Sequence, residues 1–543
     1  MKTPKIDSKK IPILLAVFIF FLLAARFAFF LVSPRSELIG VIPDDAFYYI
    51  QIASHRAKDG FWTFDGTTPS TGFHFLYGYF LVFIFKIIPE INWVGIYLVV
   101  GIISCLSISS AAYFLTRTAN EIYGKAVALA AALPFFSFPI ILQNTAMMES
   151  WLVIFLASLT IFFVAQQKKA SPKLLFGLFL VGLLGSLSRT DYGMLPGILF
   201  CTILFAERFK ITPSVVRSFT ILSGAVIGVF VVLVHNYFIS GQLAQASAQT
   251  KLFWSSVLGH SIHAPLQLVL SIFFPSFDFI EHQSKIILLL TSFVILAYYS
   301  IKSIKLANKK KNELLPAALS LGCALTVLGY IFFYRYNSAA LQAWYSSNFL
   351  APISIATASL FHYLLRRRAF IPVLFTFVIY IFFGANSIFS IPWPHQAGMM
   401  NAGIYIRSLD EKSTFAAWNA GIISYFSGKP VVNIDGLVND EILPYIRKNK
   451  LMDYLKIKRI DYVVDYKEMI DNKSLRLRGG YDDERVFRCL VPIEPVDGNS
   501  IGWSGSRLIL FKVNAACLSK AAHYQDSEKP APPSRWFADG RVG

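Results

Sequence analysis

The sequence is poor in cysteine and in charged residues. Its five cysteines form no C-x-x-C pair, which argues against a zinc ribbon. Only 15% of the 543 residues are charged, whereas 55% are hydrophobic and the mean hydropathy is +0.54. No soluble domain has this composition. Several runs of about 17–23 apolar residues instead indicate transmembrane helices.

Two further patterns are missing from the sequence. The first apolar run, residues 11–32, follows a lysine-rich start but has no small-x-small cleavage site and is longer than the apolar part of a signal peptide. We therefore expect it to be the first membrane helix. The chain also shows no internal repeat, which argues against transporters that are built from repeated halves.

Acidic residues are fewer than basic ones, and the formal net charge is +18. Much of the excess lies in short loops between apolar runs, at Lys168-Lys169, Arg208 with Lys210, Lys309–Lys311 and Arg366–Arg368. Short basic loops stay on the cytoplasmic side of a membrane, so topology explains the charge and no nucleic-acid partner is needed.

With these loops inside, residues 1–390 form a polytopic α-helical domain with about 11–12 apolar segments. The segment 72–89 is short and contains His74 and Lys86, so we interpret it as an interfacial or re-entrant helix. Eleven crossings then remain, and the last apolar runs are 285–301, 314–334, 346–364 and 369–390. This topology predicts a multi-pass protein of a membrane that borders the cytoplasm. Its N-terminus is cytoplasmic, and residues 34–92 form a large first external loop.

From residue 391 the composition changes to that of a small α/β domain. Segments 414–418, 430–435, 461–465, 485–491 and 507–513 have strand patterns, and 421–428 and 440–456 have helical ones. Residues 391–518 are predicted to form this domain outside the cytoplasm, where an oxidising compartment would allow a disulfide between Cys489 and Cys517. Residues 519–543 are rich in proline, alanine and polar groups and are predicted to be disordered.

Unusual polar residues of the membrane half gather on the predicted external face. An aspartate at the centre of a membrane helix costs roughly 3 kcal/mol, but at the interface the cost is small. The set comprises Asp44, Asp45, His74, Glu149, Arg189, Asp191, Lys251, Arg335 and Tyr336, with Trp344 and Tyr345 nearby. A carboxylate can act as a general base and cations can hold a phosphate, which suits a reaction on an anionic lipid-linked substrate.

Each member of this set also has a structural explanation. Asp44 and Glu149 can favour helix N-termini, and Arg189 can pair with Asp191 at a helix end. Trp344 and Tyr345 fit an aromatic belt, and Lys251 fits a snorkelling cation. The shared side of the carboxylates is the stronger argument for a site.

Several short motifs resemble the bacterial GT-C glycosyltransferases, whose broader relatives are the aminoarabinose transferase of lipid A and the protein O-mannosyltransferases. Asp44-Asp45 with the helix that follows, Phe64-Asp65-Gly66 and Thr71–His74 resemble the first external loop of that group. Further similar segments are Met148–Ser150, Ser188–Asp191, Trp344-Tyr345 before Ala351-Pro352, Trp418–Gly421 and Val432–Asn439. The sequence departs from the pattern at Met147, where relatives often have glycine, and in lacking a proline before Lys251.

The resemblance implies a transferase that uses a polyprenyl-phosphate-linked sugar on the non-cytoplasmic side and inverts the anomeric carbon. Asp44 would be the base that activates the acceptor, while Asp45 and Glu149 would position the acceptor or bind a divalent cation together with His74. The donor phosphate and substrate would contact Arg189, Asp191, Lys251, Arg335, Tyr336, Trp344, Tyr345 and His74. The polyprenyl tail would lie among membrane lipids in a groove between helices.

Three alternatives remain at the level of sequence. A lipid or glycan flippase would also have many helices, although it would not need a folded external domain. A non-catalytic envelope-assembly subunit would use that domain for docking, and an oligosaccharide ligase would use a pyrophosphate carrier. The sequence names neither the sugar nor the acceptor, which can be a glycan, a lipid or a protein.

Overall fold

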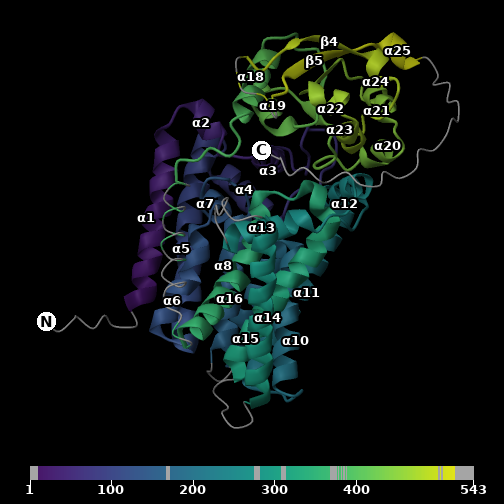
Figure 1. Cartoon of the computed structure of the whole chain (residues 1–543). Coiled ribbons are helices and arrows are strands. Elements are labelled where there is room, and N and C mark those ends of the chain that lie inside the picture. The colour runs from purple at the N-terminus through teal and green to yellow at the C-terminus, as the bar shows by residue number, and fades with distance from the viewer. Residues whose placement is uncertain are drawn as a thin grey trace.

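The computed structural model describes residues 10–166, 171–273, 282–306, 314–366, 388–498 and 505–519, with isolated positions between 367 and 387 and at 500 and 502. The protein is mostly helical, and a small α/β domain sits on one end of a bundle of long helices (Figure 1). The predicted last span, 369–390, is described only at alternate positions from 376 to 386 and at 388–390, and the predicted disordered tail, 519–543, lies outside the described residues except for Ser519. The boundaries 1–390 and 391–518 remain predictions.

Long apolar helices build the bundle. In the described part, six helices are long and apolar enough to cross a membrane, and the number rises to eight if each of two bent pairs is one span. The six are α1 (Lys10–Val32), α5 (Trp93–Tyr123), α11 (Pro213–Ser240), α14 (His282–Leu306), α15 (Leu314–Tyr334) and α16 (Ser346–Arg366). This architecture confirms the predicted polytopic membrane protein.

The first bent pair and the shorter helices occupy other predicted spans, whereas the second bent pair lies in 239–284, a segment expected to be polar with one weak apolar patch. One pair joins α6 (Lys125–Ala132) and η1 (Leu133–Phe136) to α7 (Phe138–Ile141) and η2 (Leu142–Asn144) at 71°, and α12 (Ala246–Leu258) meets α13 (His263–Phe273) at 110°. The shorter helices are α8 (Ser150–Ala165), α9 (Pro172–Ser188) and α10 (Met194–Ala206). The count of eleven crossings stays a prediction.

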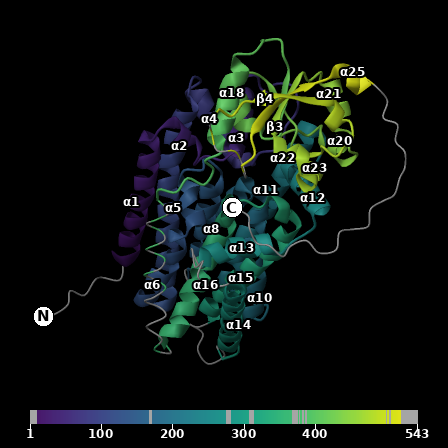
Figure 2. The same ribbon diagram turned by 45° about the horizontal axis from the view of Figure 1, so that its top comes forward.

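The segment expected to lie at the interface forms α4 (Phe75–Ile87), a helix of 13 residues. At 1.5 Å per residue it is about 20 Å long, shorter than the hydrocarbon core of about 30 Å. It follows α2 (Arg35–Ile39) and α3 (Asp44–Lys58), and these three helices lie between the bundle and the α/β domain (Figures 1 and 2).

Helices α9 and α11 pack at very short range, which fixes the position of the residues that follow α9. A Cβ on Gly182 would lie 1.9 Å from the Ile221 carbonyl oxygen, and one on Gly224 would lie 2.1 Å from that of Phe179. Small residues of this kind let membrane helices approach closely. The tight pair holds Arg189, directly after α9, at the end of the bundle near the α/β domain.

The strands that the structure describes form one five-stranded sheet in the order β2-β1-β3-β5-β4. Strands β1 (Phe415–Ala417), β2 (Val431–Asn433) and β3 (Tyr462–Tyr466) are parallel, while β5 (Leu508–Val513) runs antiparallel to β3 and to β4 (Leu490–Pro495). The helices of the domain are α18 (Gln396–Arg407), α19 (Ala420–Ser427), α20 (Leu443–Arg447), α21 (Leu451–Ile457), α22 (Lys467–Asp471), α23 (Lys473–Gly479), α24 (Val486–Cys489) and α25 (Ala515–Ser519).

Two predicted elements of this domain differ from the structure. The helix expected over 440–456 is broken into α20 and α21, because Asn449 adopts a φ of 52°, a left-handed conformation that asparagine tolerates. The strand expected over 485–491 begins only at Leu490, after the short helix α24. The disulfide between Cys489 and Cys517 is present as predicted and ties the end of α24 to α25.

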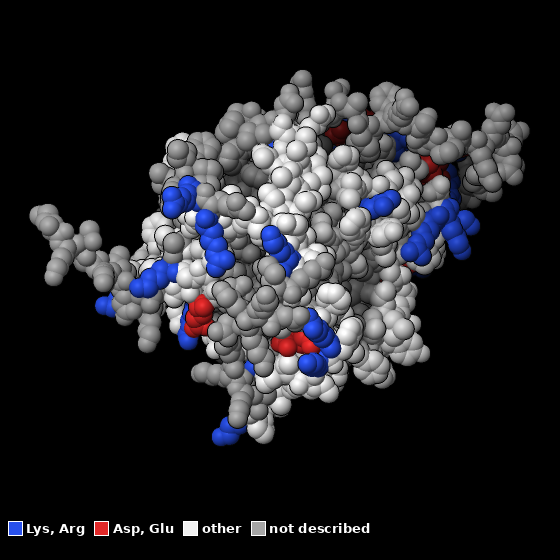
Figure 3. Space-filling model, turned by 60° about the horizontal axis from the view of Figure 1, so that its bottom comes forward, with Lys and Arg blue, Asp and Glu red and all other residues white. Residues whose placement is uncertain are grey.

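The end of the bundle opposite the α/β domain carries exposed basic side chains. Figure 3 shows that end, where the charged side chains are mainly blue. Helices α6 and α9 begin there and α10 ends there, with the exposed side chains of Lys125, Lys173, Arg208 and Lys210 at these helix ends. These described basic side chains and the α/β domain are therefore at opposite ends of the helices.

Candidate functional site

Helix α3 presents two polar faces to two different partners. Asp44, Tyr48 and Gln51 recur at helical spacing and contact the α/β domain, whereas Asp45 and Tyr49 lie one position on and face the bundle. Pro43 begins the helix, so both carboxylates lie in its first turn, where the helix dipole favours negative charge. Adjacent aspartates thus take different roles because successive side chains point about 100° apart.

The Asp44 carboxylate is directed into the α/β domain. It accepts hydrogen bonds from the backbone amides of Ile422 (2.7 Å) and Gly421 (3.2 Å) at the start of α19. Burial raises the pKa of Asp44 to about 7, although these amides favour the ionised form. The structure therefore places the expected base at a domain contact, away from the cavity described next.

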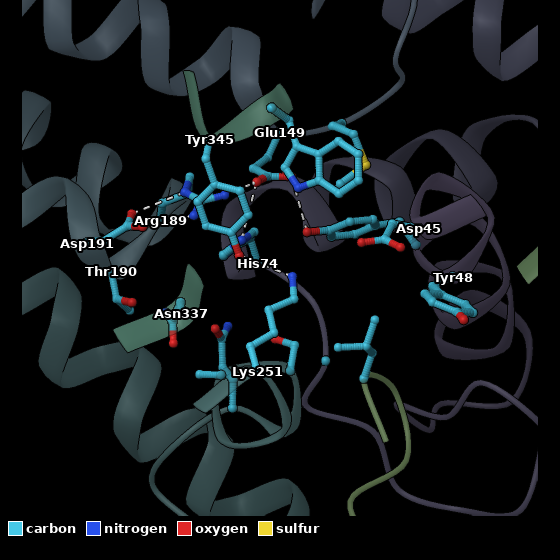
Figure 4. A pocket seen from close by; sticks show the side chains of 18 of the residues that line it. Asp45, Tyr48, His74, Glu149, Arg189, Thr190, Asp191, Lys251, Asn337 and Tyr345 are labelled. Carbon is cyan, nitrogen blue, oxygen red and sulfur yellow. Dashed lines mark hydrogen bonds and ion pairs between the residues drawn. The ribbon is translucent and has the colours of Figure 1, made fainter. Parts of the chain in front are cut away.

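A polar cavity of about 110 Å³ lies beneath the α/β domain (Figure 4). Asp45 lines it, and among the described residues its carboxylate has no hydrogen-bond or ion-pair partner. Burial raises the pKa of Asp45, and the charge of Lys251 opposes that shift. Of the predicted site residues, the structure brings together Asp45, His74, Glu149, Arg189, Asp191, Lys251, Trp344 and Tyr345 around this cavity.

One wall of the cavity is an ion-pair network. The Arg189 guanidinium bonds Glu149 Oε1 at 2.6 Å and Asp191 Oδ2 at 2.8 Å, and it stacks on the Tyr345 ring with 4.5 Å to the centroid. The other Glu149 oxygen accepts a hydrogen bond from Tyr49, and Tyr334 donates to Asp191. The predicted pair of Arg189 and Asp191 is confirmed, but two carboxylates already saturate the charge of this arginine.

His74 completes the network as a neutral side chain. Its Nε2 lies 3.3 Å from Glu149 Oε1, and burial lowers the pKa of His74 to about 4. A neutral imidazole with its proton on Nε2 donates a hydrogen bond to the carboxylate. For Glu149, burial would raise the pKa, yet His74 and Arg189 outweigh burial and hold the pKa below its ordinary value.

Lys251 is the cation of the cavity that remains available. Its Nζ lies 3.1 Å from the Tyr345 hydroxyl, and no carboxylate of the described chain lies within ion-pair distance. The side chain is buried and comes from α12, on the side of the cavity facing Asp45 and Tyr345 (Figure 4). A buried ammonium without an anionic partner suits an anionic ligand.

Arg335 and Tyr336 do not reach the cavity. Both are exposed, and each contacts the other or His260, with 5.9 Å from the Arg335 guanidinium carbon to the Tyr336 ring. Their place in the lining is taken by Asn337 from the same short helix, η5 (Arg335–Ala340). Sequence reasoning chose the charged residue, although the turn points the asparagine inward.

Asp45, His74 and Glu149 do not form the metal site considered from the sequence. Among the described residues no group of three or more histidine, cysteine, aspartate or glutamate side chains is arranged to hold an ion. Glu149 is already engaged by Arg189, His74 and Tyr49, and Arg189 supplies the positive charge that a metal would bring. The donor set therefore does not fit a divalent cation.

Met147 shows how the sequence departure near Glu149 is accommodated. Its φ is 52°, so it adopts the left-handed conformation that a glycine would take, and its carbonyl oxygen accepts a hydrogen bond from Tyr77. The turn before Glu149 is therefore kept without glycine.

The α/β domain adds residues to the site that sequence reasoning missed. Leu437 lines the cavity, and Asp435 accepts a hydrogen bond of 2.8 Å from Tyr48, which also lines it. Arg478 of α23 acts electrostatically on both Asp45 and Asp435. Asp435 lies in the segment Val432–Asn439, whose resemblance to the GT-C group assigns it no role. Arg478 follows Arg476 in a basic segment, and nothing in the local sequence distinguishes the two arginines.

The segment Thr71-Gly72 fastens the α/β domain to the first loop and to α12. Asp440 accepts hydrogen bonds from the Thr71 amide (2.6 Å) and hydroxyl (2.7 Å), and that hydroxyl also accepts from the Ala246 amide at the start of α12. Gly72 packs so closely that a Cβ there would lie 1.9 Å from the Leu437 carbonyl oxygen.

We expect Gly72→Ala to destabilise the folded protein by about 1–3 kcal/mol, because the added methyl forces the two segments apart. Thermal unfolding and proteolysis of the α/β domain would measure the effect. Gly177→Ala is the matched control, since nothing lies within 4 Å of a Cβ at that helical position. Equal behaviour of the two variants would contradict the tight contact.

Comparisons with known proteins fit this architecture. The structure aligns with ArnT from Cupriavidus metallidurans bound to undecaprenyl phosphate at a TM-score of 0.54 and 11% identity, covering 93% of this chain and 99% of ArnT. It aligns with the apo oligosaccharyltransferase of Archaeoglobus fulgidus at 0.53 and 12% identity, covering 94% and 78%. The chain has the GT-C fold. The resemblance predicted from the motifs is thereby confirmed at the level of fold.

A family model matches most of the C-terminal α/β domain. Residues 394–508 match a family model described as a domain of unknown function, DUF8728. No curated protein matches the chain. The matched segment begins just before α18 and ends at the start of β5.

Proposed function

We propose that this GT-C protein transfers a sugar from a polyprenyl-phosphate donor to an acceptor on the extracytoplasmic side of a bacterial cytoplasmic membrane. The observation that carries the proposal is that Asp45 and Lys251 line one cavity, each without an ion-pair partner among the described residues. A carboxylate without an ion-pair partner can remove the proton of the acceptor, and a cation without one can stabilise the negative charge of the departing phosphate.

Asp45 is the proposed base in place of Asp44. Its carboxylate would remove the proton from an acceptor hydroxyl or amine as that group attacks the anomeric carbon of the donor. The new glycosidic bond forms while the bond from the anomeric carbon to the phosphate oxygen breaks, and the configuration inverts. The electron pair leaves with polyprenyl phosphate, whose charge Lys251 would stabilise.

The network of Glu149, Arg189, Asp191 and His74 would hold the shape of the cavity. Arg189 stacks on Tyr345, and Tyr345 in turn bonds Lys251, so the network positions the cation. Trp344 lies beside Tyr345 and is buried at the wall. The network and Trp344 would therefore affect donor binding indirectly, because they hold Lys251 in place and fix the shape of the pocket.

The sidedness of the site supports an external reaction. The cavity lies at the end of the bundle that bears the α/β domain, and the exposed basic side chains of Lys125, Lys173, Arg208 and Lys210 lie at the other end (Figures 1 and 3). A disulfide in the α/β domain suits an oxidising compartment. Nucleotide sugars are cytosolic, so an external site needs a lipid-linked donor, and the undecaprenyl phosphate of the ArnT structure supports that class. The tail would lie in a groove between helices, among membrane lipids.

Transfer from a panel of radiolabelled polyprenyl-phosphate sugars to membrane acceptors tests the proposal. We expect Lys251→Gln to lower kcat/KM for the donor by about 10–100-fold, because a charge-assisted hydrogen bond to phosphate contributes about 1.5–3 kcal/mol. Lys173→Gln is the control, because Lys173 is exposed at the start of α9, at the end of the bundle away from the cavity. Equal donor kinetics in the two variants would remove Lys251 from the donor site, and lipid flipping by wild type without transfer would favour the flippase.

A further inference from the structure

Three buried N–H donors belong to side chains that contact one another where α12 meets the α/β domain. They are the Nε1 groups of Trp254 and Trp418 and the Nε group of Arg478, and none has a hydrogen-bond partner within the described residues. Trp254 is 1% exposed and Trp418 is 7% exposed. A buried polar group without a partner costs about 1–3 kcal/mol, so three together need a reason.

The three side chains form one compact cluster. The indole rings of Trp254 and Trp418 stack with centroids 5.1 Å apart, and the Arg478 guanidinium carbon lies 4.4 Å and 4.8 Å from the two centroids. Stacking on aromatic faces holds the planar guanidinium while leaving its N–H groups free. Arg478 itself is partly exposed, which gives the cluster a route to solvent.

The charge of Arg478 is not neutralised by its surroundings. No carboxylate of the described chain lies within ion-pair distance of it, although Asp45 and Asp435 act on it from farther away. Burial raises the pKa of Asp435 to about 8, which weakens it as a counter-ion for Arg478. Burial lowers the pKa of Arg478 only to about 10, so the guanidinium keeps its charge.

The cluster is linked to the cavity through Lys251 and Tyr48, which both line the cavity. Trp254 lies one turn beyond Lys251 on α12, and Trp418 accepts through its carbonyl oxygen a hydrogen bond from Tyr48. A ligand group held here would sit near Asp45, on the side of the α/β domain rather than in the donor pocket.

We propose that Arg478, Trp254 and Trp418 form an acceptor subsite that binds an anionic group, a carboxylate or a phosphate, on a glycan acceptor. The inference rests on the proposed transferase function. A bound anion would accept hydrogen bonds from the three N–H donors and would pair with the charge of the Arg478 guanidinium. A purely structural pin between α12 and the α/β domain would not need unpaired donors.

Thermal unfolding of the purified full-length protein in detergent tests the subsite without requiring transfer. A ligand that binds the folded state raises the unfolding temperature. The probes are glucuronate for the carboxylate, glucose 6-phosphate for the phosphate, and glucose at equal concentration and ionic strength. We expect a rise with at least one anionic sugar and none with glucose. The proposal would be overturned if neither anionic sugar raised the unfolding temperature, or if glucose raised it equally.

Variants assign the binding to the cluster. Arg478→Gln should weaken binding of the active probe at least about tenfold, which corresponds to about 1.4 kcal/mol. Lys473→Gln, on the exposed face of the same helix, should leave it unchanged. Unaltered binding by Arg478→Gln would contradict the subsite. If that variant does not fold, Trp254→Phe and Trp418→Phe keep the rings and remove the N–H donors, and each should weaken the probe.

Lys251→Gln separates this inference from the proposed function. A probe held by the cluster still binds this variant, whereas one held by the donor pocket does not. Loss of binding in Lys251→Gln but not in Arg478→Gln would overturn the acceptor subsite. Loss only in Arg478→Gln, in a protein that transfers no sugar, would sustain the anion site and refute the transferase.

Discussion

Replacing Asp45 with asparagine is expected to lower the turnover of sugar transfer by about 10²–10⁴-fold, the usual contribution of a positioned general base. The variant keeps the shape of the side chain but cannot accept the acceptor proton. Because burial raises the pKa of Asp45, the wild-type rate should increase with pH through a pKa above the ordinary aspartate range. That limb of the pH profile should be absent in the variant.

Asp44→Asn is the control for this experiment, since it changes the neighbouring carboxylate that contacts α19. We expect it to retain transfer per folded molecule while lowering thermal stability, because an amide cannot accept both backbone N–H bonds. The reverse outcome, with Asp44→Asn inactive at full stability and Asp45→Asn active, would return the base to Asp44.

Arg189→Gln should destabilise the folded protein by about 3–5 kcal/mol, the cost of leaving a buried charge without its partner. Glu149 is completely buried, and Asp191 loses its bidentate partner as well. Chemical or thermal unfolding of the purified protein in detergent would measure the loss, and the donor affinity should fall together with it because Tyr345 is released.

Arg117→Gln provides the matched comparison. Arg117 pairs with Glu121 one turn along α5 at 2.8 Å, but both side chains are more than 40% exposed. Exposed pairs of this spacing contribute only about 0.3–0.5 kcal/mol. If Arg189→Gln and Arg117→Gln lose the same free energy of unfolding, burial does not determine how much the Glu149 network contributes to stability.

Sequence patterns predicted the bundle, the α/β domain and much of the cavity because each leaves a local signal. Apolar runs mark the helices, and the strands of the domain alternate with short helices. Glu149, Arg189 and Asp191 were grouped because helix ends on one side of a membrane meet at the same face. Their distances bear out that reasoning.

The choice between Asp44 and Asp45 could not be made from the sequence. Both stand in the first turn of α3, and only the arrival of α19, nearly 380 residues later, decides which of them is covered. Arg335 and Arg478 show the same limit, since one arginine points to solvent and the other enters a tryptophan cluster without any local difference. Long-range packing assigns these roles.

The doubled use of α3 limits how freely this protein can be recombined. The helix that carries Asp45 also supplies Asp44, Tyr48 and Gln51 to the α/β domain. A chimaera that exchanged only the C-terminal domain would leave these three polar side chains without their hydrogen-bond partners, next to Asp45. The new domain would have to supply matching amides and carboxylates. The domain therefore cannot be treated as an interchangeable module, and the two parts must change together in evolution.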